Sequence, residues 1–392
     1  MKFVKSIVTL MMAGAAFINS AETLAEPIPI RGVVEGFYGT PWTHENRLDM
    51  LNFCGTHGFN AYIYAPKDDV YHRAKWREPY PDDKLAELAA LVQSAKDNNV
   101  KFIFAVSPGL DLRYGSKADQ RAMIAKLSTM YNLGVRAFAI FFDDIQDKDG
   151  GAQAEFLNEI QKNFIDKYDD VLPLITVPTE YFSKDMIDDL GRKPYTANFS
   201  MTLNPKIMVL YTGEGVVQPA LTDEQYKTTS NAYNRNLGIW WNYPVNDYME
   251  NKLALGPIEN LPQNSDIPAI FFNPMKYENL SKIALATAAD YAKDPNNYNA
   301  DNSWNKAIDE QFGNLAKDMK LFASYFQHLE NNWANIGRPD AKISEATHQQ
   351  LKALKSTIKK LQAKLPANIL NECKTQLDEL EKEVDAALSN QK

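Results

Sequence analysis

Short apolar segments rich in valine, isoleucine and phenylalanine recur along the chain, separated by longer segments in which apolar residues repeat every three to four positions. Short apolar runs of this kind are typical of strands buried on both faces. We place eight of them at residues 31–36, 59–65, 101–107, 135–142, 172–177, 207–212, 237–242 and 267–273. Helical periodicity fills the intervals, for example at residues 44–58, 84–98, 119–133 and 153–168. Strand followed by helix, repeated over about 250 residues, predicts a (β/α)8 TIM barrel of the α/β class.

A doubly wound open sheet is the alternative explanation of this alternation. Many sheets of that kind carry a Gly-x-Gly-x-x-Gly turn after their first strand, which holds a dinucleotide. No such motif follows the first predicted strand. The sequence therefore favours the barrel.

The pattern changes after Asn273 to amphipathic helix with few strand signals. This part contains Trp and Phe at residues 304–333 and is rich in Lys, Leu and Glu at residues 343–388, where Pro366 should separate two helices. One apolar stripe in the second half contains Leu351, Leu354, Ile358, Leu361 and Leu365. We predict that this stripe packs within the protein. The alternative is a partner groove, with the helices serving as a partner-binding module.

The first residues have the pattern of a secretory signal peptide, with Lys2 and Lys5, an apolar stretch at 7–18, and small and polar residues at 20–25. The apolar stretch is too short to cross a bilayer as a mature helix. We therefore expect an exported protein, periplasmic or secreted, with no stable membrane anchor after cleavage. The predicted regions are a signal peptide at 1–25, a catalytic barrel at 26–300 and a C-terminal helical region at 301–392.

Composition narrows the classes of partner. The formal net charge is −8 and no long block of Lys or Arg occurs, which argues against a nucleic-acid-binding surface. The two cysteines, Cys54 and Cys373, are far apart in sequence, so we expect buried or free thiols instead of a disulfide framework. The five histidines lack the spacing of zinc ligands. We predict neither a metal nor a cofactor.

The candidate chemistry begins at residues 135–147, VRAFAIFFDDIQD, where a buried strand delivers two adjacent aspartates, Asp143 and Asp144. Neighbouring side chains of a strand point to opposite faces, so both carboxylates can reach one site only where the strand ends. Two like charges held together raise the pKa of at least one of them, which gives one proton donor and one ionised carboxylate. Glycoside hydrolysis uses such a pair. The alternative is an aspartate-rich turn that caps the next helix.

The other strand ends of a barrel meet this pair at the C-terminal mouth. They carry glycine, polar and aromatic residues, in the segments 35–39, 65–69, 178–181, 211–213, 240–244 with Asp247 just beyond, and 273–274. Aromatic rings cover the C–H faces of a sugar, while amides and carboxylates bind its hydroxyls. Together these residues predict a sugar-binding pocket, whereas each one alone could be a turn, a cap or a surface charge.

Five longer motifs resemble, in the same order, those of glycoside hydrolase family 84, which contains the bacterial and animal O-GlcNAcases. The motifs are RGVVEGFYGTPW at 31–42, YIYAPKDDVYHRAKWREPYP at 62–81, FAIFFDDIQD at 138–147, ITVPTEY at 175–181 and WWNYPVNDY at 240–248. The resemblance extends from the first motif to the region of Trp304 and implies a TIM barrel with β-N-acetylglucosaminidase activity. Phe142 departs from the tryptophan that some bacterial relatives carry at this position.

The resemblance also implies a retaining, substrate-assisted mechanism, in which the substrate's 2-acetamido oxygen attacks the anomeric carbon and forms an oxazoline. Asp143 would orient the acetamido N–H, and Asp144 would be the general acid and then the general base. By matching position, the residues that would bind sugar hydroxyls or carbonyl are Gly36, Lys67, Asn242, Asp247 and Asn273, and those that would line the acetamido pocket are Tyr181, Thr212 and Trp240.

The function implied by the resemblance is that of an exported exo-β-N-acetylglucosaminidase. Its substrates would be β-GlcNAc-bearing glycans or O-GlcNAc glycoproteins. The alternative is a catalytically silent barrel that binds GlcNAc or a glycan and has lost turnover; the presence of both aspartates argues against it.

Overall fold

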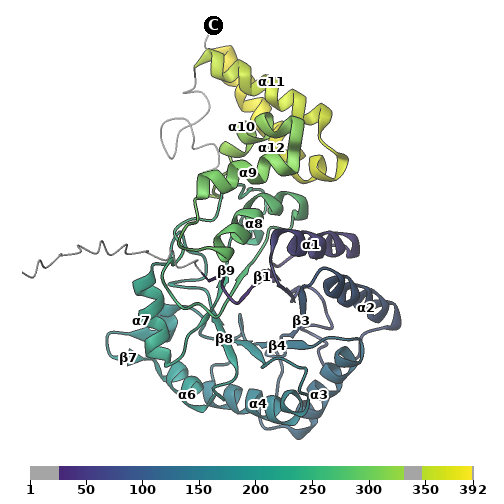
Figure 1. The fold of residues 1–392 in the computed structure, drawn as a ribbon, viewed down its shortest axis with the longest axis vertical. Coiled ribbons are helices and arrows are strands. Elements are labelled where there is room, and N and C mark those ends of the chain that lie inside the picture. The colour runs from purple at the N-terminus through teal and green to yellow at the C-terminus, as the bar shows by residue number, and fades with distance from the viewer. Residues whose placement is uncertain (1–25, 331–346, 391–392) are drawn as a thin grey trace, which may run out of the picture.

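The computed structural model of the chain describes residues 26–330 and 347–390, and its main feature is a closed barrel of parallel strands (Figure 1). The strands are β1 (Ile30–Glu35), β2 (Ala61–Tyr64), β3 (Lys101–Val106), β4 (Ala137–Phe141), β5 (Ile175–Val177), β8 (Met208–Tyr211), β9 (Gly238–Trp241) and β10 (Ala269–Phe272). Each pairs with its neighbours along the chain, and β10 closes the barrel against β1. The eight predicted strands and the barrel are confirmed, and the open sheet is excluded.

Helices form the outer layer around the barrel (Figure 1). They are α1 (His44–His57), α2 (Asp82–Asp97), α3 (Lys117–Asn132), α4 (Gly150–Asn163), α6 (Pro194–Thr202), α7 (Asp223–Tyr233) and α8 (Glu278–Lys293). The four helical segments named from periodicity are confirmed, with Gln153–Tyr168 ending in a short 3-10 turn, Ile165–Lys167. The short helix α5 (Ser183–Met186) and the hairpin β6 (Ile187–Asp188) with β7 (Gly191–Arg192) were not predicted, because two-residue strands have no detectable periodicity.

Apolar side chains fill the inside of the barrel. Near its upper end, Phe141 and Trp240 meet edge to face, with their ring centroids 5.5 Å apart. Lower down, β1 and β2 approach so closely at Gly32 that a Cβ atom there would lie 1.8 Å from the carbonyl oxygen of Ala61. Only glycine fits this position. The barrel is thus a packed core that closes the site from below.

The C-terminal helices are α9 (Ala300–Phe312), α10 (Ala316–Ser324), α11 (His348–Lys364) and α12 (Ala367–Asn390), and they extend from α8 away from the barrel (Figure 1). Pro366 separates α11 from α12, as predicted. The five residues of the predicted apolar stripe are at most 8% exposed and belong to a common core with α10 and α12. Packing within the protein is therefore confirmed for this stripe. The division between residues 300 and 301 stays a prediction.

Three further expectations concern cysteines and membranes. Cys54 and Cys373 are both buried and free, as predicted. In the described parts of the chain, no helix is both long enough and apolar enough to cross a bilayer. The predicted signal peptide lies outside the described residues.

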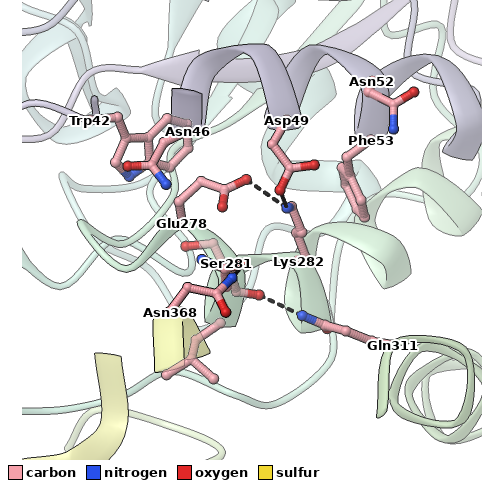
Figure 2. Close-up of polar contacts among 12 residues, drawn as sticks. Trp42, Asn46, Asp49, Asn52, Phe53, Glu278, Ser281, Lys282, Gln311 and Asn368 are labelled. Carbon is pink, nitrogen blue, oxygen red and sulfur yellow. Dashed lines mark hydrogen bonds and ion pairs between the residues drawn. The ribbon is translucent and has the colours of Figure 1, made fainter. Parts of the chain in front are cut away.

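One polar cluster, which we call the junction cluster, connects the barrel to the C-terminal helices (Figure 2). Glu372 of α12 accepts hydrogen bonds from the main-chain N–H groups of Asn279 (3.0 Å) and Leu280 (2.8 Å) at the start of α8. The favourable interaction of a carboxylate with a helix N-terminus explains this arrangement. Beside it, Lys282 forms ion pairs with Glu278 (Nζ–Oε1, 2.7 Å) and with Asp49 of α1 (Nζ–Oδ2, 2.6 Å). The cluster therefore links α1, α8 and α12.

The wild type is expected to lose stability as the pH rises from 5 to 8, and replacement of Glu278 by Gln is expected to remove this loss. Glu278 is 1% exposed, and burial raises its pKa to about 7, an effect that Lys282 only partly offsets. The native state thus holds a proton that the unfolded chain releases at lower pH, so this residue's contribution to stability is lost as pH rises through 7. Between pH 5 and pH 8, the free energy of unfolding of the wild type should fall by roughly 2 to 3 kcal/mol relative to Glu278→Gln.

Urea unfolding of both proteins at the two pH values measures this difference. Glu155→Gln, at an exposed position of α4, is the matched control and should follow the wild type. Parallel pH profiles for Glu278→Gln and the wild type would contradict the prediction.

Candidate active site

All ten residues predicted for the site line one cavity of about 240 Å³ at the C-terminal ends of the strands. They are Asp143, Asp144, Gly36, Lys67, Tyr181, Thr212, Trp240, Asn242, Asp247 and Asn273. The parallel barrel brings these distant segments together, because all its strands end on the same side. The cavity is smaller than the roughly 300–1,000 Å³ of most ligand pockets, so it suits one terminal sugar unit better than a long oligosaccharide.

Asp143 follows the buried strand β4 after one residue, Phe142, and is itself buried. One of its carboxylate oxygens, Oδ2, accepts a hydrogen bond from the ammonium group of Lys67. The other oxygen, Oδ1, is buried and has no hydrogen-bond partner in the structure. Because buried carboxylate oxygens are normally paired, this atom is an acceptor ready for a donor brought by a ligand.

Asp144 is exposed at the mouth of the cavity and has a left-handed backbone conformation, with φ of 55°. Aspartate is one of the few residues that adopt this conformation readily. The turn directs the carboxylate to two phenol groups, with Tyr38 donating to Oδ2 (2.7 Å) and Tyr181 donating to Oδ1 (2.8 Å). The end of the strand therefore separates the two carboxylates into different surroundings.

The sequence predicts a raised pKa for at least one aspartate of the pair, and the pKa of Asp144 is shifted in the opposite direction. Removal of water by the surrounding side chains raises the pKa, but the charge of Lys67 and the hydrogen bonds from Tyr38 and Tyr181 outweigh it. The result is a pKa below the ordinary value, so the Asp144 carboxylate is ionised without a ligand. At Asp144 the repulsion between the aspartates does not decide the direction of the shift, because a cation from another strand end compensates it.

Lys67 lies at the end of β2 and is 5% exposed, which rules out the interpretation as a surface charge. Its ammonium group lies 5.8 Å from the ring centroids of both Tyr38 and Trp240. The loop that carries it is fixed by Asp69, whose Oδ2 accepts hydrogen bonds from Tyr64 (2.8 Å) and Tyr80 (2.9 Å). Lys67 is thus held between two aromatic rings and against Asp143.

Two amides connect the strand ends on the other side of the cavity. Asn242 Oδ1 accepts hydrogen bonds from the indole of Trp240 (2.8 Å) and from the side chain of Asn273 (2.9 Å). Asn273 Oδ1 in turn accepts from the main-chain N–H of Gly36 (3.2 Å). A Cβ atom on Gly36 would lie 2.3 Å from the Trp240 ring, so glycine is required for this contact. The network holds the Trp240 ring in place.

The remaining predicted residues complete the wall. Asp247 accepts a hydrogen bond from the main-chain N–H of Tyr38 (2.8 Å), which ties the loop after β9 to the loop after β1. Thr212 donates to the carbonyl of Gly215 (2.6 Å) and so shapes the loop after β8. The neighbouring Trp241 lies in the outer core instead, because successive strand residues point to opposite faces.

Several residues of the site were not selected from the sequence. Six further residues line the cavity, namely Tyr38, Val177, Val216, Val217, Val245 and Tyr248. Tyr38 stands within the first motif and beside Gly36, so a signal existed for it. Val216 and Val217 are apolar residues in a loop, which carries no such signal. In the described chain, no group of three or more His, Cys, Asp or Glu side chains is placed to hold a metal ion.

A parallel barrel with an aspartate pair and aromatic walls at its C-terminal mouth defines a glycoside hydrolase class of site. The sequence model of a family described as beta-N-acetylglucosaminidase matches residues 31–324. This chain belongs to that family, glycoside hydrolase family 84. The resemblance of the five motifs is thereby confirmed.

Two curated relatives and two solved structures illustrate the similarity. Protein O-GlcNAcase of Mus musculus is 33% identical over 297 residues, 72% of this chain and 32% of the relative, and that of Rattus norvegicus is 33% identical over 67% and 30%. This chain thus spans about a third of their length. The structure of CpGH84B is 40% identical (TM-score 0.86; 93% of this chain, 68% of that one). An O-GlcNAc hydrolase mutant of Thermobaculum terrenum is 28% identical (TM-score 0.81; 91% and 82%).

Proposed function

We propose that this protein is a retaining exo-β-N-acetylglucosaminidase of the O-GlcNAcase type that hydrolyses β-linked GlcNAc with the help of the substrate's own acetamido group. The observation that carries the proposal is the buried, unpartnered Oδ1 of Asp143. An acetamido N–H is a donor of the right kind for this atom, and a buried acceptor gains most from a ligand that supplies one. The small cavity favours removal of a terminal sugar unit.

In the first step, Asp143 accepts a hydrogen bond from the acetamido N–H, which makes the acetamido carbonyl oxygen more nucleophilic. That oxygen attacks the anomeric carbon and an oxazoline forms that keeps its N–H proton, hydrogen-bonded to Asp143, while the bond to the leaving group breaks and Asp144 gives its own proton to the departing oxygen. In the second step, Asp144 takes a proton from water, the water oxygen attacks the anomeric carbon, and the oxazoline opens with net retention. No enzyme nucleophile is needed.

Asp144 must gain a proton before the first step, because without a ligand its carboxylate is held ionised. In the proposal, protonation of Asp144 depends on Tyr181, whose hydroxyl changes its hydrogen-bond acceptor when the substrate binds. When the acetamido oxygen accepts the Tyr181 hydroxyl, Asp144 loses one of its two phenol donors, and the bound sugar excludes water from the carboxyl group. Both effects raise the pKa of Asp144 towards the protonated form.

We further propose that the substrates are β-GlcNAc-bearing glycans or O-GlcNAc glycoproteins and that the protein is exported to the periplasm or secreted. The substrate class follows from family membership and from the curated relatives, which are protein O-GlcNAcases. Export rests on the signal-like sequence of residues 1–25. Fractionation of cells that express the full chain, beside a chain without residues 1–25, tests the location.

The activity is tested by hydrolysis of an aryl β-N-acetylglucosaminide and of the matching N-acetylgalactosaminide. We expect turnover of the gluco sugar and its loss in Asp143→Ala and Asp144→Ala. Binding of GlcNAc without turnover would instead support the silent glycan-binding barrel.

A further inference from the structure

Arg73 is a residue of the cavity surroundings to which the proposed reaction gives no role. It lies in the loop after β2, four residues beyond the Asp69 that fixes this loop, and its main-chain N–H donates to the Asp69 carbonyl (3.3 Å). The preceding residue, His72, is fully buried, with its ring bound to the carbonyl of Ala105 (2.7 Å) and to Ser107 (3.1 Å). The position of Arg73 is therefore set by a rigid part of the barrel.

The guanidinium group of Arg73 contacts the Asp144 turn in two ways. Nη1 donates to the Tyr38 hydroxyl (3.0 Å), which itself donates to Asp144 Oδ2. Nη2 donates to the main-chain carbonyl of Asp144 (3.3 Å). The guanidinium carbon also lies 5.4 Å from the centroid of the Tyr38 ring. One planar cation thus binds both the phenol that holds the carboxylate and the backbone that aims it.

We propose that Arg73 is a positioning residue for Asp144, acting through the Tyr38 hydroxyl and through the Asp144 main-chain carbonyl. Among the described residues, Arg73 makes no ion pair with a carboxylate side chain, and the two hydrogen bonds of its guanidinium go to the Tyr38 hydroxyl and to the main-chain carbonyl of Asp144. The inference rests on the proposed function, in which Asp144 transfers the proton.

The physical reason is that the hydrogen bonds from Arg73 to Tyr38 and from Tyr38 to Asp144 strengthen each other. A phenol that accepts a hydrogen bond from a cation is polarised and becomes a stronger donor to the next acceptor. The bond to the Asp144 carbonyl fixes the left-handed turn that aspartate permits at this position and thereby fixes the direction of its carboxylate. The planar fork of arginine can make both contacts together, whereas a lysine ammonium is a point charge on a flexible stem.

Five charged or titratable groups share the surroundings of Asp144. Lys67 and Arg73 come from the loop after β2, Tyr38 from the loop after β1 and Tyr181 from the loop after β5, and Asp143 is its chain neighbour after β4. Lys67 forms its ion pair with Asp143, and Arg73 takes no part in that contact, so we expect the ion pair to remain when Arg73 is changed. Replacement of Arg73 therefore isolates the contribution of its two guanidinium hydrogen bonds, one to the Tyr38 hydroxyl and one to the Asp144 main-chain carbonyl.

The first experiment is a titration of the Asp144 carboxyl group by ¹³C NMR in protein labelled at aspartate, with the signal assigned by its absence from Asp144→Asn. In Arg73→Met we expect the midpoint to rise by roughly half a pH unit or more, because a cation and a strengthened hydrogen bond are lost. Arg121→Met, at an exposed position of α3, is the matched control and should leave the midpoint unchanged. An unchanged midpoint in Arg73→Met would overturn the proposal.

Two further variants separate positioning from simple charge. In the Arg73→Met, Tyr38→Phe double variant, the shift should be smaller than the sum of the single shifts, because both act through one hydroxyl. Arg73→Lys should restore the midpoint only in part. Full restoration of the midpoint by lysine would show that the planar guanidinium is not required. Additive shifts in the double variant would refute positioning through Tyr38.

Kinetics connect this result to the reaction. Arg73→Met should lower kcat about 10- to 100-fold on substrates with poor leaving groups, lower it less on activated aryl substrates, and leave KM nearly unchanged. Equal losses on both classes would contradict a role through Asp144. If the wild type hydrolyses nothing while the NMR shift is present, then the proposed function fails and the structural link between Arg73 and Asp144 stands.

Discussion

Asp144→Asn is expected to lower kcat/KM roughly 10²- to 10⁴-fold for substrates with poor leaving groups and far less for activated aryl glycosides. An alkoxide leaves slowly without a proton, whereas a nitrophenolate leaves readily. Asparagine preserves the size of the side chain and one acceptor for the Tyr38 or Tyr181 hydroxyl, which donate to the two oxygens in the wild type. The defect should therefore lie in proton transfer and not in the shape of the cavity.

Hydrolysis of a series of aryl β-N-acetylglucosaminides with leaving groups of increasing pKa measures this effect. The logarithm of kcat/KM should fall more steeply with leaving-group pKa in Asp144→Asn than in the wild type. Asp147→Asn, an exposed aspartate of the same loop, is the matched control and should keep the wild-type slope. If Asp144→Asn loses the same factor on every substrate, the general acid has been assigned to the wrong residue.

The positions of these residues could be predicted because they depend on topology. A buried apolar run ends where its strand leaves the core, so the sequence alone places Asp143 at the mouth of the barrel. The same reasoning located Asn273 and Lys67, which come from opposite ends of the catalytic region of the chain. Barrel closure places β10 and β2 on either side of β1, so both residues line one cavity.

Contacts between loops could not be predicted in this way. The two phenols reach Asp144 only because its backbone turns to a left-handed conformation, and aspartate permits that turn without demanding it. The contact of Arg73 depends in turn on the buried ring of His72. The pKa of Asp144 illustrates the consequence, since the repulsion within the pair could be inferred from the sequence, whereas the contacts by which Lys67 and the two phenols compensate it could not.

Asp143→Asn is expected to slow poor and activated substrates alike, by roughly 10²- to 10³-fold, since the residue acts on the nucleophile and not on the leaving group. In the wild type, Oδ2 is neutralised by Lys67 while Oδ1 stays free for the acetamido N–H. Asparagine removes the negative charge that makes this N–H contact strong. It also leaves the buried Lys67 ammonium without its counter-ion, so stability must be measured together with activity.

The double variant Lys67→Met, Asp143→Asn separates the two effects, because it removes the unpaired charge while the nucleophile remains unassisted. Its stability should recover relative to Asp143→Asn, whereas its activity should not. Substrates with increasingly fluorinated N-acetyl groups then report on the nucleophile directly, because fluorine withdraws electrons from the carbonyl oxygen that attacks. The wild type should slow with each added fluorine, and Asp143→Asn should respond differently, since its assistance to the N–H is weakened. A wild type that is insensitive to fluorination would require an enzyme nucleophile and would remove the acetamido group, and with it Asp143, from the first step.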